Sequence, residues 1–106
     1  MISQQTIDDA VQRLIAAAHP AKIILFGSYA RGEASDDSDL DFLVILPTLA
    51  NKHQEMVRLR RALRPLQIPV DVLVASTTEV DEWGHLPSTT LYWALTEGKV
   101  LHEAAN

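Results

Sequence analysis

Two short clusters of residues have the types and spacing needed for phosphate chemistry. Residues 27–32 read Gly-Ser-Tyr-Ala-Arg-Gly, and residues 38–41 read Ser-Asp-Leu-Asp. A glycine turn frees backbone amides for phosphate oxygens, and carboxylate oxygens are the ligands that Mg²⁺ prefers. A nucleoside triphosphate needs both kinds of group, so the two clusters together predict a metal-dependent nucleotide site.

Carboxylates at Asp39, Asp41 and Asp71 are the candidate metal ligands. Side chains alternate along a strand, so Asp39 and Asp41 are expected to share one face and one cation. Asp71 lies within the apolar run 70–74, where a carboxylate is costly unless it is paired, solvated or bound to metal. It is the predicted third ligand. The alternative is that Asp39 belongs to an acidic turn and Asp71 begins an edge strand.

Gly27 and Ser28 have a structural reading as well as a functional one. Strand-to-helix turns commonly use Gly for backbone freedom and Ser as a helix N-cap. Here the start of the following helix is predicted to point its amides beyond Asp39 and Asp41, where anions are favoured. Arg31 either assists as a cation near the triphosphate or lies on a surface turn.

The elements that must position these residues can be read from apolar periodicity and from Gly and Pro breaks. Four helices are predicted. The first begins near Ser3 or Thr6 and ends at Ala18, and the second runs from Ser28 to near Gly32. The third runs from Leu49 to Leu66, and the fourth from a Ser88 cap to Glu97. The predicted strands are 22–26, 39–46, 70–75 and an edge strand 99–102. This order implies one α/β domain over residues 1–106, with a small mixed β-sheet flanked by helices.

Composition limits the classes of partner. The 106 residues carry a net charge of -5, which argues against a DNA backbone as ligand. There is no cysteine for a disulfide or a thiolate zinc site, and no apolar stretch of membrane-spanning length. No targeting segment is recognised at the N-terminus, so a cytoplasmic protein is predicted.

Two further clusters have no assigned chemistry. One helix carries a basic face made of Arg58, Arg60, Arg61 and Arg64. This face is predicted to be solvated; the alternative is that it binds an acidic partner or nucleic acid. The last quarter of the chain holds aromatic residues that either complete a core or form a docking surface: Trp83, Tyr92 and Trp93. Tyr29 is expected either to pack over the nucleotide or to cover the turn.

The two motifs, with Asp71, resemble the active-site signature of the minimal nucleotidyltransferases, within the DNA polymerase beta-like superfamily. The resemblance covers most of the chain and implies a mixed α/β fold of the polymerase beta palm type. It implies that catalysis and metal binding belong to Asp39, Asp41 and Asp71. It also implies two Mg²⁺ ions, ATP as the substrate, and a set of nucleotide-binding residues: Gly27, Ser28, Arg31 and Ser38.

The same resemblance implies a reaction and a partner. Minimal nucleotidyltransferases are commonly encoded with HEPN ribonuclease toxins, and some act as antitoxins by adding AMP to a toxin tyrosine. A chain of this size leaves little protein to enclose an acceptor, so a partner is expected to supply that side, and an oligomer is compatible with the sequence. The alternatives are a non-catalytic module that masks a partner, and a transferase acting on a small molecule.

Overall fold

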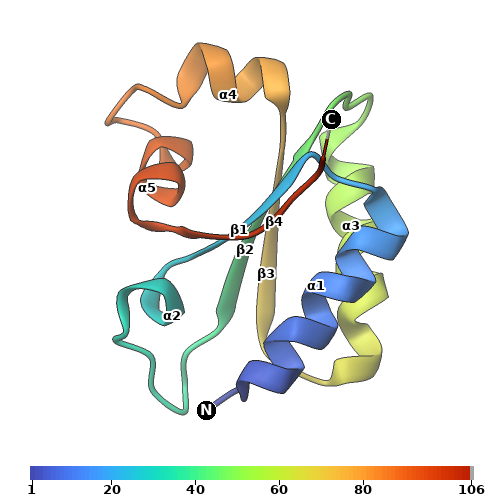
Figure 1. Cartoon of the computed structure of the whole chain (residues 1–106), viewed down its shortest axis with the longest axis vertical. Coiled ribbons are helices and arrows are strands. Elements are labelled where there is room, and N and C mark those ends of the chain that lie inside the picture. The colour runs from blue at the N-terminus through green and yellow to red at the C-terminus, as the bar shows by residue number, and fades with distance from the viewer. Residues whose placement is uncertain (106) are drawn as a thin grey trace.

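A four-stranded mixed sheet forms the centre of the computed structural model, which describes residues 1–105 (Figure 1). The spatial order is β3-β2-β1-β4. The strands are β1 (Lys22–Phe26), β2 (Leu40–Leu46), β3 (Val70–Ser76) and β4 (Lys99–Glu103). This agrees with the predicted mixed sheet, and strand 39–46 begins one residue later than expected.

The register of β2 brings the predicted site residues together. β1 pairs antiparallel with β2 and with β4, whereas β2 pairs parallel with β3. A parallel pair requires a crossover, and α3 (Lys52–Leu63) with a 3-10 turn (Arg64–Leu66) supplies it. Asp41 is thereby placed opposite Asp71 on β3 and opposite Phe26 on β1.

Helix α1 (Gln4–Ala18) forms where the apolar periodicity predicts it. Its N-cap is Ser3, whose side chain accepts a hydrogen bond from the Thr6 amide at 3.2 Å. It ends at His19, which adopts φ 46°, immediately before Pro20.

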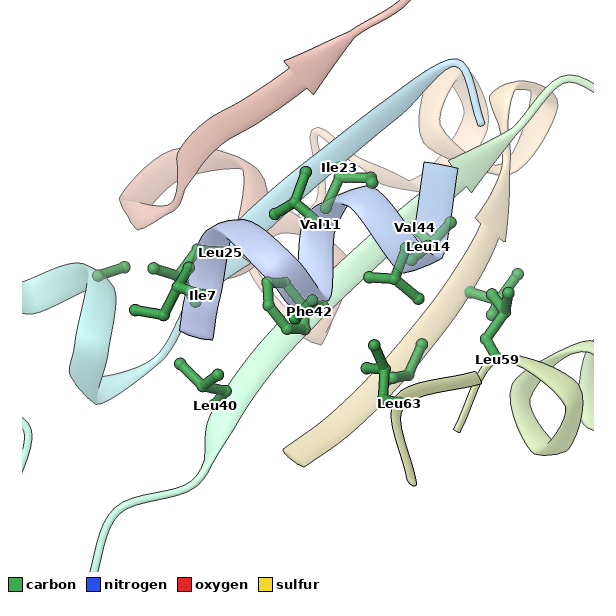
Figure 2. Packing of buried hydrophobic residues seen from close by; sticks show 14 of the residues in the cluster. Ile7, Val11, Leu14, Ile23, Leu25, Leu40, Phe42, Val44, Leu59 and Leu63 are labelled. Atoms are coloured by element: carbon green, nitrogen blue, oxygen red, sulfur yellow. The ribbon is translucent and has the colours of Figure 1, made fainter. Parts of the chain in front are cut away.

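One face of the sheet packs against α1 and α3 to form the larger core, shown in Figure 2. Phe42 and Val44 from β2 lie beneath Leu14 of α1, while Leu59 and Leu63 of α3 close the side over β3. The side chains of Phe42, Leu14 and Leu59 are fully buried. Phe42, Val44 and Leu46 belong to this core, so they occupy the face of β2 opposite Asp41, as the alternation of side chains along a strand requires.

The opposite face carries the carboxylates and a smaller core. Leu43 and Ile45 of β2 pack there with Ile24, Ala75 and Ala94. Two helices cover this core, α4 (Thr77–Trp83) and α5 (Thr90–Glu97). Figure 1 shows α4 at the top of the view and α2 (Ser28–Arg31) at the lower left, with α5 between them.

Several predicted helix boundaries were wrong for local reasons. The short helix α2 has Gly27 rather than Ser28 as its N-cap, and no side chain caps it. Helix α3 begins at Lys52, because Asn51 accepts a hydrogen bond from the Gln54 amide. Helix α5 is capped by Thr89 rather than Ser88.

Helix α4 was missed, although its N-terminus has a recognisable signature. Ser76 accepts from the Glu79 amide at 3.0 Å and the Glu79 carboxylate accepts from the Ser76 amide at 3.1 Å. This capping box could have been read from the sequence Ser-Thr-Thr-Glu.

Of the two arrangements expected for the aromatic residues near the end of the chain, a completed core is not observed for Trp83 and Trp93. Trp83 is 51% exposed and Trp93 is 49% exposed, with Tyr92 meeting Trp93 edge to face. Within residues 1–105, no helix has the length and apolar character needed to cross a membrane.

Candidate active site

The turn between β1 and α2 lies directly against the Asp41 carboxylate. Gly27 adopts φ 75° and ψ -154°, a region that is nearly exclusive to glycine. A Cβ atom added there would lie 2.3 Å from Asp41 Oδ2, well inside contact distance. The predicted neighbourhood of the glycine turn and the double-Asp strand is therefore real, and Gly27 is required both for its conformation and for the close approach.

Asp41 is the electrostatic centre of the site. Burial raises the pKa of its carboxyl, the neighbouring Asp71 and Asp39 raise that pKa further, and Arg31 lowers it in part. Asp41 is half-buried, whereas Asp39 is exposed just before β2 begins. Asp39 and Asp71 therefore each lie close enough to Asp41 to repel its carboxylate, which a cation would relieve.

Asp71 has a partner that the sequence did not indicate. The Arg60 guanidinium, from α3, donates to Asp71 Oδ1 in an ion pair that is half exposed on both sides. Part of the basic helix face is thereby explained, because Arg60 crosses to the carboxylate edge of β3. No spacing in the sequence predicts this contact, because it depends on how α3 packs beside the sheet.

The carboxylates are not preassembled into a complete metal centre. Across the described residues 1–105, no group of three or more His, Asp or Glu side chains has an arrangement that could hold a metal ion. Their chemistry nevertheless suits a hard divalent cation, because they are oxygen ligands, and burial together with repulsion from Asp71 and Asp39 raises the pKa of Asp41. Asp71 Oδ1 is occupied by the Arg60 guanidinium in this arrangement.

Arg31 and Tyr29 have specific places around the turn. Arg31 donates through Nε to Glu33 at 3.1 Å and approaches Glu97 of α5 at 3.7 Å. Its charge still reaches Asp41. The Tyr29 hydroxyl accepts from the Ile2 amide at 2.9 Å, and its ring packs against the larger core. Tyr29 therefore covers the turn rather than an open nucleotide surface.

Ser38 lies in the acidic loop that leads into β2. Its hydroxyl accepts a hydrogen bond from the Ser35 amide at 2.9 Å, which closes that loop. The residue borders a shallow hollow that also involves Met1 and Tyr29, away from the Gly27 turn. Its local contact is thus structural, and nucleotide binding by Ser38 remains a prediction.

Comparison with known proteins agrees with this geometry. The nucleotidyltransferase domain family matches residues 5–92, most of the chain. The chain belongs to this family, as its glycine turn and double-Asp strand predicted.

A curated relative points in the same direction over a shorter segment. A candidate protein adenylyltransferase of Methanocaldococcus jannaschii is 47% identical over 36 residues. The matched segment covers 31% of this chain and 36% of that relative.

Solved structures share the fold at low sequence identity. A candidate nucleotidyltransferase from Sulfolobus solfataricus matches with TM-score 0.66 and 20% identity, covering 93% of this chain and 78% of that one. A toxin–antitoxin structure with AMP-PNP matches with TM-score 0.63 and 21% identity, covering 92% and 73%. A mutant of the toxin–antitoxin pair MntA–HpeT matches with TM-score 0.60 and 19% identity, covering 97% of this chain and 75% of that one. The predicted nucleotidyltransferase fold is therefore confirmed.

Proposed function

We propose that this nucleotidyltransferase moves AMP from ATP to a tyrosine hydroxyl of a partner HEPN ribonuclease toxin in the cytoplasm, and so acts as an antitoxin. The observation that carries the catalytic part is the register of Asp41 with Asp71 beside the Gly27 turn. A module that only masked a partner would have no need of clustered carboxylates that repel one another.

Each site residue has a role in this proposal. Gly27 and Ser28 hold the terminal phosphates, and Arg31 and Ser38 assist in binding the nucleotide. Asp39, Asp41 and Asp71 hold two Mg²⁺ ions. When bound, these ions would neutralise triphosphate charge and lower the pKa of the attacking hydroxyl.

The reaction is an in-line displacement at the α-phosphorus. The acceptor oxygen forms a bond to this phosphorus, and the bond from it to the bridging oxygen of the β-phosphate breaks. Pyrophosphate leaves on the side of Gly27. The hydroxyl proton passes to a carboxylate on the acceptor side, for which Asp71 is best placed because β3 lies beyond β2 from Gly27.

A toxin protein as the partner is supported by the structural relatives. Two of the solved structures with this fold are toxin–antitoxin assemblies, and one of them contains AMP-PNP.

Nucleotide binding is the first test. Calorimetry with Mg²⁺ and a non-hydrolysable ATP analogue should show binding that weakens at least tenfold in Asp41→Asn. Asp37→Asn is the matched control, because Asp37 is an exposed carboxylate in the neighbouring acidic loop. Equal affinity of wild type and Asp41→Asn would refute the proposed site.

Intact-mass measurement is the second test. The chain and its co-purified partner protein, incubated with ATP and Mg²⁺, should yield partner heavier by one or more AMP groups, localised to tyrosine by fragmentation. Asp39→Asn and Asp41→Asn should abolish the addition. A triple variant at Asp39, Asp41 and Asp71 that still neutralises the partner would show that masking suffices without catalysis.

A further inference from the structure

An apolar hollow lies beside the carboxylates on the same face of the sheet. It encloses about 240 Å³ and is lined by Leu43 of β2, Leu73 of β3, Trp83 of α4 and Leu91 of α5. Its charged lining residues are Lys52 and Glu79, which form an ion pair with each other at 2.5 Å. The hollow therefore presents mainly hydrocarbon and indole to a ligand.

The position of the hollow relative to the site follows from strand geometry. Leu43 and Leu73 pair in the register of β2 and β3, two residues beyond the paired Asp41 and Asp71. Side chains two residues apart on a strand share a face and lie roughly 7 Å apart. The hollow thus begins about one tyrosine ring's length from the carboxylates.

The direction of the proposed reaction identifies which substrate reaches this hollow. In-line displacement puts the attacking oxygen opposite the leaving pyrophosphate. Gly27 follows β1 and touches Asp41 on β2, so the leaving group lies toward β1. β3 lies on the other side of β2, and the acceptor therefore enters over Asp71 and Leu73.

We infer that the hollow binds the phenol ring of the acceptor tyrosine, with its hydroxyl directed toward Asp71. This inference rests on the proposed function and names a subsite for its acceptor. The apolar walls and the half-exposed indole of Trp83 favour an aromatic ring. Because Lys52 and Glu79 neutralise each other, the hollow offers no charged partner to a polar cationic small molecule.

Nuclear magnetic resonance of the ¹⁵N-labelled chain tests the subsite with N-acetyl-L-tyrosinamide as the probe. The two indole N–H groups are matched reporters: Trp83 lines the hollow, whereas Trp93 is equally exposed and donates to the Pro87 carbonyl. The probe should shift the Trp83 indole and the Leu73 amide and leave the Trp93 indole unmoved. Trp83→Ala should weaken probe binding roughly five- to tenfold, and Trp93→Ala should leave it unchanged.

Adenosine, titrated separately, distinguishes the competing occupant. If adenosine shifts the Trp83 indole and the tyrosine probe does not, the hollow belongs to the nucleobase and the inference is overturned. Absence of any shift at Trp83 with either ligand overturns it equally. The proposed function is followed independently at the Gly27 and Ser28 amides on addition of ATP and Mg²⁺. Loss of that response, with tyrosine binding retained, would refute the nucleotide site and leave the aromatic subsite standing.

Discussion

Replacing Gly27 with alanine tests whether the turn and the Asp41 carboxylate form one structural unit. The glycine's φ 75°, ψ -154° conformation should cost about 1–3 kcal/mol for alanine. The added Cβ would also lie 2.3 Å from Asp41 Oδ2 and 3.1 Å from its Cγ, which contributes about 1–3 kcal/mol of overpacking. We therefore expect Gly27→Ala to lower the free energy of unfolding by roughly 2–6 kcal/mol, a large share of a typical domain's stability.

Gly32 provides a matched control for the conformational part. It has a similar φ of 73°, yet an added Cβ would meet no atom within 4 Å. Gly32→Ala should therefore cost only about 1–2 kcal/mol. Urea unfolding followed by circular dichroism measures both variants against the wild type.

A double variant isolates the contact itself. Asp41→Ala removes the carboxylate oxygens and Cγ that the new Cβ would approach. The cost of Gly27→Ala should fall by about 1–3 kcal/mol in that background, as a double-mutant cycle would measure. If Gly27→Ala costs no more than Gly32→Ala, or if removing the carboxylate gives no relief, the proposed close packing of turn and carboxylate is wrong.

Three further predictions concern the charges of the site and its surroundings. Arg60→Ala should change stability by less than about 1 kcal/mol, because its pair with Asp71 is half exposed. It should nevertheless raise affinity for Mn²⁺ severalfold in calorimetry, and unchanged affinity would show that Arg60 does not compete with metal. The pKa of Asp41 is raised above 3.8, so its ionised form is disfavoured in the folded state and stability falls as the pH rises through the folded pKa. In the presence of a metal chelator, Asp41→Asn should accordingly raise Tm at pH 7 and leave Tm unchanged at pH 3. An equal rise in Tm at the two pH values would show that ionisation of Asp41 is not the cause. Burial opposes ionisation of Glu79, but the bonds from Lys52 and Ser76 outweigh it and lower its pKa below 4.5. Its contribution is therefore present above pH 4.5 and lost as the pH falls through the folded pKa, so Glu79→Gln should cost up to about 1 kcal/mol at pH 7 and nothing at pH 2, by urea unfolding.

The sequence alone was sufficient for the family and for most of the architecture. The pattern from Gly27 to Asp41 predicted the nucleotidyltransferase family, and the family match over residues 5–92 confirms it. Short apolar runs rich in β-branched residues located strands β1 to β3 nearly to the residue, because such runs fit a buried sheet and Gly27 ends the first of them. Helix caps were less predictable, since Ser88 and Thr89 are chemically equivalent candidates and packing selects Thr89.

What only the tertiary structure decided is how residues distant in the chain meet around the carboxylates. Parallel pairing sets Asp71 beside Asp41, and the packing of α3 brings Arg60 to Asp71. Gly27 lies so close to Asp41 that no Cβ atom fits between them, and this approach depends on how the strands and helices are assembled. The same is true of the apolar hollow. Residue types and spacing determine which groups can do the chemistry because they act locally. Distances between those groups arise from long-range packing, which local sequence does not encode.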